Sequence, residues 1–250
     1  MFTKIKTEQE IKDMRTSGAM LGTILELLGK KLAPGITPKE LSAIAKAELK
    51  KLGGEPAFLG FSGYPDIICI SVNEEVQHTI PNDRVLKEGD VVNLDFGVRF
   101  NGMITDAGRT FGVGKISEDA QRLLTGTEEA LKAAIKKVKN GIKIEAVSGV
   151  IEDVLLSHNL GIVRNLVGHG VGHELHEEPE IPNYRLYEQS PRLKTGMTIA
   201  IEPITTLGSE EIVQSPDGWT LLTADGSWSA QFEHTLLVTD DGAEVLTLPS

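Results

Sequence analysis

A ten-residue segment of this chain occurs twice. Residues 86–95 read LKEGDVVNLD, and residues 193–202 read LKTGMTIAIE. Leu, Gly and the closing acid recur 107 positions apart, in the pairs Leu86 and Leu193, Gly89 and Gly196, and Asp95 and Glu202. The alternating residues after each glycine predict a β-strand in each copy. We therefore expect two related halves whose acidic strand ends converge on one site.

The repeat extends upstream of the two strands. Gly35-Ile36 before Leu41-Ser42 resembles Gly141-Ile142 before Val147-Ser148, at an offset of 106 positions. Each copy therefore predicts two helices followed by strands that carry acids. No Pro- or Ser-rich linker separates the copies. We interpret residues 1–250 as a single domain built from two fused halves, approximately 1–115 and 116–250, that share one sheet.

Local signals define the elements of each half. Capping boxes and N-cap residues predict four helices, which begin near Thr7, Thr37, Ser117 and Ile144. Asn101-Gly102 is a strong hairpin turn signal. Strands are expected at Ile67–Val72, Val91–Val98, Met103–Phe111, Thr198–Thr205, Trp219–Thr223, Gln231–Val238 and Ala243–Leu248.

The composition excludes several classes of function. Apolar residues make up 40% of the chain and charged residues 24%, the proportions of a folded globular protein. The net charge of −11 disfavours nonspecific binding to DNA or to an anionic membrane. No apolar run approaches membrane length, and the single cysteine, Cys69, cannot form an internal disulfide. We expect a cytoplasmic protein and, without an evident interaction tail, a monomer.

The acids that end the two related strands lie on the less apolar face of each strand. Because alternate side chains share a face, Asp95 lies with Asn93, and Glu202 lies with Ala200. The neighbouring positions on the opposite faces are apolar. A single acid in this position is usually solvated, but two acids at equivalent positions favour a functional site.

Two further acids extend this pair to a cluster. A hairpin would bring Asp106 beside Asp95, and Glu233 on a later strand would complete a group of four carboxylates with Glu202. Without cations, such groups repel one another and take up protons. Divalent cations remove that repulsion, and shared carboxylates suit a pair of metal ions. The oxygen-rich set favours Mn, Fe, Co or Zn over a thiolate-type site.

Three of the six histidines lie in residues 168–179, GHGVGHELHEEP. On an extended segment His169 and His173 share a face and His176 takes the other, so a bend is needed to bring His169 and His176 together. The glycines permit such a bend. His173-Glu174-Leu175-His176 has the wrong spacing for the helical zinc-protease motif, in which the second histidine lies four residues after the first and Glu directly follows the first. The glycines before this segment and Pro179 after it also disfavour a helix. His158 and His234 are expected to be structural.

In these segments the chain resembles the type I methionine aminopeptidases, a family of the pita-bread metallopeptidase fold. The resemblance covers almost the whole chain. It rests on Asp95, Asp106, GYP at 63–65, CISVNE at 69–74, HTIP at 78–81, GHG at 168–170, HEEP at 176–179, IEP at 201–203, DGW at 217–219 and SAQFEHT at 229–235. It implies an α+β fold with two pseudo-symmetric halves around a central antiparallel sheet and helices packed on its outer side.

The resemblance also implies a pair of divalent metal ions (Co, Mn, Fe or Zn), held by Asp95, Asp106, His169, Glu202 and Glu233. Asp106 and Glu233 would bridge the two ions. Asp95 would complete one metal site, and His169 with Glu202 would complete the other. The free α-amine of the substrate would bind on the Asp95 side, which explains the removal of one residue only.

The implied reaction is hydrolysis of the bond after the initiator methionine of nascent proteins and peptides, with preference for a small second residue. Glu202 would be the general base, His176 would hydrogen-bond the developing oxyanion, and His78 would contact the scissile amide and assist proton transfer. The implied partners are nascent N-termini that begin with Met. A transient ribosome contact is compatible with that substrate, and specific DNA or membrane binding is not expected.

The implied methionine pocket would be lined by Phe58, Phe61, Tyr64, Cys69, His78, Leu175 and Trp219, and His176 would also contact the substrate. Aromatic and sulfur contacts suit a thioether side chain. Leu175 stands where the family commonly has Phe, and His173 stands where Arg is common. Thr79 replaces a Gly that often follows the catalytic His. We expect Leu175 to loosen the pocket, His173 to add a metal or substrate contact, and Thr79 to narrow the entrance.

Two alternatives remain open at this stage. A proline-specific aminopeptidase or dipeptidase of the same fold would carry the same five ligands. Such enzymes usually have an extra N-terminal domain and a His shortly before the Gly-His-Gly segment, where this chain has residues 164–166, RNL. A non-catalytic binding protein of the same fold is the second alternative, and the presence of all five ligands and both histidines argues against it.

Overall fold

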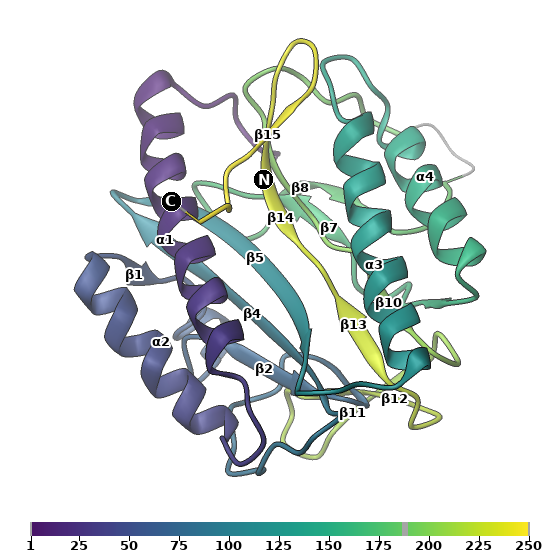
Figure 1. Cartoon of the computed structure of the whole chain (residues 1–250). Helices are drawn as coiled ribbons and strands as arrows, with labels where there is room; N and C mark the ends of the chain where they lie inside the picture. The colour runs from purple at the N-terminus through teal and green to yellow at the C-terminus, as the bar shows by residue number, and fades with distance from the viewer. Residues whose placement is uncertain (1, 187–189, 250) are drawn as a thin grey trace.

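Two pairs of helices lie on one side of two antiparallel sheets (Figure 1). The computed structural model describes residues 2–186 and 190–249. In the first half, α1 (Glu8–Lys31) and α2 (Pro38–Leu52) precede the main strands; in the second half, α3 (Glu118–Lys137) and α4 (Ile144–Ser157) do the same. This order is the one that the sequence repeat predicts.

Each half contributes one main sheet. In the first, β4 (Val91–Phe100) pairs with β5 (Met103–Gly112) on one edge and with β2 (Cys69–Val72) and β1 (Glu55–Pro56) on the other. The second runs in the order β15 (Ala243–Val245), β14 (His234–Val238), β9 (Thr198–Ile201), β7 (Gly168–Gly170) and β8 (Glu177–Ile181).

Two smaller three-stranded sheets flank the main sheets. One is formed by β11 (Ile212–Gln214), β12 (Leu221–Thr223) and β3 (Glu75–Gln77), and the other by β13 (Ser229–Gln231), β10 (Ile204–Thr206) and β6 (Gly161–Ile162). A short 3-10 helix spans Phe61–Gly63.

The helix ends form where the sequence signals predict them. Thr7 and Thr37 each accept a hydrogen bond from the backbone N–H of the glutamate three residues later, and that glutamate bonds back to complete a capping box. Ser117 caps α3 through its side chain. Gly53 ends α2 in the left-handed conformation, which glycine adopts without a steric cost.

The apolar faces of the repeated strands form two equivalent cores. Val92, Leu94 and Phe96 of β4 pack with buried residues of α1 and α2. Ile199 and Ile201 of β9 pack with buried residues of α3 and α4. In both halves the helices therefore cover the apolar face, and the acids lie on the opposite face.

The same hydrogen bonds recur in the two halves. Gly35 N–H donates to the Leu86 carbonyl over 2.8 Å, and Gly141 N–H donates to the Leu193 carbonyl over 2.8 Å. Leu86 and Leu193 each donate in return, to the carbonyls of the residues that follow those two glycines. Gly89 and Gly196 both have positive φ, 91° and 85°, before their strands. The sequence repeat is therefore also a repeat of backbone structure.

The two halves meet along β5 and the β13–β14 region. Glu233 N–H donates to the Gly108 carbonyl over 2.8 Å, and the Thr235 hydroxyl bonds to both backbone groups of Asp106. An isolated bridge pairs Arg109 with Phe232. These contacts bring the acid-bearing strands of the two halves side by side (Figure 1).

Several predicted strand boundaries were wrong. Thr198–Thr205 is divided into β9 and β10 around Glu202-Pro203, because proline has no N–H for the ladder. Gln231–Val238 is divided into β13 and β14 around Phe232 and Glu233. The predicted strand at Ile67 begins at Cys69, and the sequence signals do not predict β7 and β8. Two of the predicted acids therefore lie at breaks in the strands.

None of the helices within the described part of the chain combines the length and apolar character that a membrane crossing requires.

Candidate metal centre and substrate pocket

The β4–β5 hairpin places two carboxylates on one face. Asn101 and Gly102 turn with positive φ, 49° and 84°, as the Asn-Gly signal predicts. The ladder pairs Asp95 with Gly108 and Asp106 with Gly97, so the two acids are diagonal neighbours across adjacent strands.

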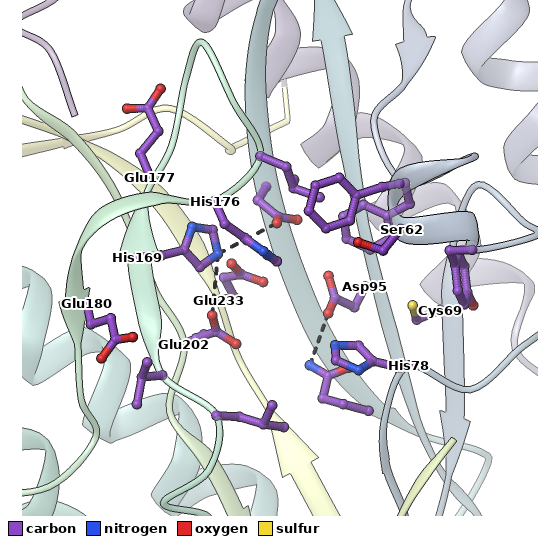
Figure 2. A pocket seen from close by; sticks show the side chains of 18 of the residues that line it. Ser62, Cys69, His78, Asp95, His169, His176, Glu177, Glu180, Glu202 and Glu233 are labelled. Atoms are coloured by element: carbon purple, nitrogen blue, oxygen red, sulfur yellow. Dashed lines mark hydrogen bonds and ion pairs between the residues drawn. The ribbon is translucent and has the colours of Figure 1, made fainter. Parts of the chain in front are cut away.

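The second half supplies two more carboxylates and an imidazole. Glu202 directly follows β9, and Glu233 directly precedes β14. His169 on β7 lies opposite Ala200 of β9. Its Nε2 atom is 3.5 Å from Glu202 Oε1 and 3.9 Å from Asp106 Oδ2 (Figure 2). Its other nitrogen, Nδ1, is 2.9 Å from the Gly170 carbonyl, which leaves Nε2 to face the carboxylates.

All five predicted metal ligands are buried, and burial shifts their pKa values. Desolvation raises the pKa of Asp95 to about 7. It raises the pKa values of Asp106, Glu202 and Glu233 well above their usual range, and the neighbouring carboxylates add to the effect. Burial, with a smaller contribution from His176, lowers the pKa of His169 to about 3. The imidazole is therefore neutral, which is the form that binds metals.

The donor set fits divalent cations. Ligand atoms of Asp95, Asp106 and Glu233 lie within 4.8 Å of one another, as do those of His169, Glu202 and Glu233. Both groups contain Glu233, so the two candidate positions are adjacent. One oxygen each of Asp95, Asp106 and Glu233 is buried with no hydrogen-bond partner. A buried carboxylate oxygen without a protein donor is expected where a cation binds.

Two glutamines contact this cluster and had not been identified from the sequence. Gln77 Nε2 donates to Asp95 Oδ2 over 3.0 Å. Gln231 Nε2 lies 3.1–3.4 Å from oxygens of Asp95, Glu202 and Glu233, and its Oε1 accepts from Asn93 over 2.8 Å. Strand alternation could have revealed Gln231, because it lies two residues before Glu233.

A cavity of about 540 Å³ opens onto the carboxylates. Every residue predicted to bind the substrate lines it: Phe58, Phe61, Tyr64, Cys69, His78, Leu175, His176 and Trp219. All five predicted metal ligands also line it, and among the described lining residues there is no Lys or Arg. Tyr64 and Trp219 meet edge to face, with ring centroids 5.1 Å apart. The cavity is therefore largely apolar at one end and acidic at the other.

The bend that the histidine segment requires is present. β7 ends at Gly170, and the chain turns before β8, so that the rings of His169 and His176 lie 4.4 Å apart. The ring of Phe61 contacts His176 edge to face at 5.2 Å. His78, on the opposite wall in Figure 2, has a positive φ of 60°, and burial lowers its pKa.

Two expectations about this segment were wrong. His173 does not line the cavity; its Nε2 bonds to Glu10 Oε1 of α1 over 2.7 Å, because the bend turns it to the other side of the loop. Thr79 does not narrow the entrance either. It is buried outside the cavity, and its hydroxyl accepts a hydrogen bond from Ser71.

A buried group of carboxylates and an imidazole at the end of an apolar cavity is characteristic of a metal-dependent hydrolase. The model of metallopeptidase family M24 matches residues 12–240. The chain belongs to this family. A methionine aminopeptidase of Clostridium perfringens is 43% identical over 244 residues, which cover 98% of both chains.

Solved structures agree with this assignment. A methionine aminopeptidase of Thermotoga maritima superposes with a TM-score of 0.97 at 42% identity, over 99% of this chain and 100% of the other. A prolidase of Pyrococcus furiosus has a TM-score of 0.80 at 25% identity, over 98% of this chain and 66% of its own. The expected pita-bread fold is thereby confirmed.

Proposed function

We propose that this protein removes the N-terminal methionine from proteins and peptides by metal-assisted hydrolysis. The proposal rests chiefly on one observation: His169 and four carboxylates cluster at the end of a cavity that aromatic, leucine and cysteine side chains line. Relatives that bear the name methionine aminopeptidase match nearly the whole chain at about 40% identity, whereas the similar prolidase is 25% identical.

The five ligands would hold two divalent ions, with Asp106 and Glu233 shared between them. Bound at these positions, such ions lower the pKa of water and polarise the scissile carbonyl. Metal binding would release protons from the buried carboxylates, because the pKa values of these groups are raised in the absence of cations.

The positions of three residues beside the cluster support the roles proposed for them. Glu202 lies 3.5 Å from His169, within the cluster, and would accept the proton of the attacking water. His176 lines the same cavity beside His169 and would donate to the oxyanion that develops at the carbonyl. His78 on the opposite wall would contact the scissile amide.

The cavity sets the expected substrate. The carboxylate end would bind the free α-amine near Asp95, and the end formed by Tyr64, Cys69 and Trp219 would receive the thioether side chain. Burial raises the pKa of the Cys69 thiol, so this wall remains uncharged. Because the amine must reach the acidic end, one residue would be removed from a free N-terminus. Nascent chains are the natural source of such N-termini. We further propose that the protein is cytoplasmic and monomeric and that it contacts the ribosome transiently.

A comparison of two peptide classes tests the proposal. The purified protein would be assayed on Met-Ala-Ser and on Xaa-Pro peptides of equal length, before and after chelation. We expect cleavage of Met-Ala-Ser that chelation abolishes and an added divalent metal restores. Preferential cleavage of Xaa-Pro bonds would contradict the proposed specificity, and activity that survives chelation would contradict the metal-assisted reaction.

His176→Ala tests the proposed oxyanion contact. Removal of one such donor is expected to lower kcat by about 10²–10³-fold, with little change in KM, because the contact forms in the transition state. A defect confined to KM would assign His176 to substrate binding instead.

A further inference from the structure

The N-terminal segment lies against the loop that carries His176. Phe2 forms a parallel bridge with Glu178, and Thr3 N–H donates to the Glu178 carbonyl over 2.6 Å. Lys6 N–H donates to the Gly196 carbonyl over 2.9 Å. A segment far from the active-site residues in sequence is thus attached directly to the strand that follows His176.

Lys6 is a buried cation within this attachment. Its side chain has 0% exposure. Its ammonium group donates to Thr3 Oγ1 over 2.8 Å, to the Lys4 carbonyl over 3.0 Å and to Glu177 Oε2 over 3.3 Å. Lysine is rarely buried unless it is paired, because desolvation of the charge is costly. The ion pair with Glu177 offsets that cost.

Glu177 connects this ion pair to the histidine loop. Its other oxygen, Oε1, accepts from the backbone N–H groups of His173 over 2.8 Å and Glu174 over 3.1 Å. The carboxylate therefore closes the turn from which Leu175 and His176 enter the cavity. In Figure 2 the Glu177 carboxylate points away from the metal-ligand cluster, so it serves this turn and not the metals.

Two further contacts hold the same turn. His173 Nε2 bonds to Glu10 Oε1 in the first turn of α1 over 2.7 Å. Gly172 has a positive φ of 148°, and a Cβ atom there would lie 2.4 Å from Lys6 Cε. The loop backbone at Gly172 therefore packs closely on the end of the Lys6 side chain.

We propose that Lys6 is a positioning residue for the reaction: through Glu177, it fixes the turn that presents His176 to the substrate. The proposal rests on the function proposed above, in which His176 contacts the oxyanion. A hydrogen-bond donor that is displaced by up to about 1 Å stabilises the transition state much less, while substrate binding changes little.

Lys6→Met tests this role, because methionine keeps the unbranched chain and removes the charge. We expect kcat on Met-Ala-Ser to fall by about tenfold or more, with KM within about twofold and metal affinity unchanged. Lys4→Met, at an exposed lysine of the same segment, is the matched control and leaves kcat unchanged. Lys6→Met with Glu177→Gln repeats the test without a buried unpaired carboxylate, should the single variant fail to fold.

A double-mutant cycle with His176→Ala distinguishes positioning from a general structural effect. If Lys6 acts through His176, Lys6→Met has no further effect on kcat in the His176→Ala background. Multiplied losses in the double variant, or an unchanged kcat in Lys6→Met, would overturn the proposal for Lys6 alone. An unchanged kcat in His176→Ala would instead overturn the proposed role of His176, and the Lys6 proposal with it.

Discussion

The two halves share a backbone plan but place their acids differently. In the first half, Asp95 and Asp106 lie inside the two long strands of one uninterrupted hairpin. In the second half, Glu202 follows the end of β9, and Glu233 lies between β13 and β14. This difference supports the proposal that Asp95 serves as a metal ligand only, whereas Glu202 would both bind a metal and accept a proton.

The strands that pair with β4 and β9 also carry different side chains at equivalent positions. His169 lies opposite Ala200 of β9, and Ser71 lies opposite Asn93 of β4. Asn93 and Ala200 are 107 positions apart, so Ser71 is the counterpart of His169. The Ser71 hydroxyl bonds to Thr79, away from the cluster. Of these two equivalent positions, only the one on β7 in the second half carries an imidazole.

The largest expected effect is that of Glu202→Ala. A proposed metal ligand and the proposed base are lost together, so we expect kcat to fall by about 10²–10⁴-fold or more. Steady-state kinetics on Met-Ala-Ser would measure the loss. Near-normal turnover with metal bound would show that Glu202 is not the general base. It would also contradict the proposed difference between Asp95 and Glu202.

His169→Ser makes the second half resemble the first at this position. We expect the affinity for one of two metal ions to fall by about tenfold or more. Loss of a residue that only hydrogen-bonds to a metal ligand already lowers metal affinity or activity by about 10–100-fold. Calorimetric titration of the chelated variant would measure both affinities. Two unchanged binding steps would contradict the assignment of His169 as a ligand.

The metal-free protein is expected to lose stability as the pH rises. The folded state raises the pKa of Asp95 to about 7, above its value of about 4 in an unfolded chain, so the folded state binds more protons. This stabilising contribution is complete below pH 4 and is lost as the pH rises through 7.

Thermal unfolding of the chelated protein measures this dependence. Tm should be higher at pH 5 than at pH 8, and added metal should raise Tm more at pH 8. Asp95→Asn is the matched variant and should weaken the dependence, while the raised pKa values of Asp106, Glu202 and Glu233 maintain the remainder. A Tm of the chelated protein that increases with pH over this range would contradict the raised carboxylate pKa values.

The smallest effect is expected for Ser71→Ala. The hydroxyl bonds to Thr79 and not to the carboxylates, so its loss should lower stability by about 0.5–1.5 kcal/mol, the net value of one hydrogen bond. Denaturant unfolding would measure that change, and calorimetry should still find two metal-binding steps. A lost metal-binding step would place Ser71 in the metal site and weaken the contrast with His169.

The helices and the acid-bearing strands could be predicted because their signals are local. The capping residues Thr7 and Thr37, the Asn101-Gly102 turn and strand alternation each act over a few residues. The 107-residue repeat then placed Asp95 and Glu202 at equivalent points. The family resemblance then supplied the predicted pocket residues, and these line the cavity together with the predicted metal ligands.

The remaining features depend on contacts between distant segments. The break at Glu202, the turn of His173 toward Glu10 and the contact of Gln77 with Asp95 each require the folded arrangement. Lys6 gave no signal, because a lysine near the start of a chain is ordinarily solvated. Its partner Glu177 lies 171 positions away. Such pairs are read from the structure and not from local sequence.

Calorimetric titration of the chelated protein with Mn²⁺, followed at each step by the rate of Met-Ala-Ser cleavage, tests whether the carboxylate cluster is a catalytic metal centre. We expect two bound ions per chain and activity that rises from zero as the sites fill. Binding of no metal at the cluster, or full cleavage activity before any metal is added, would contradict it.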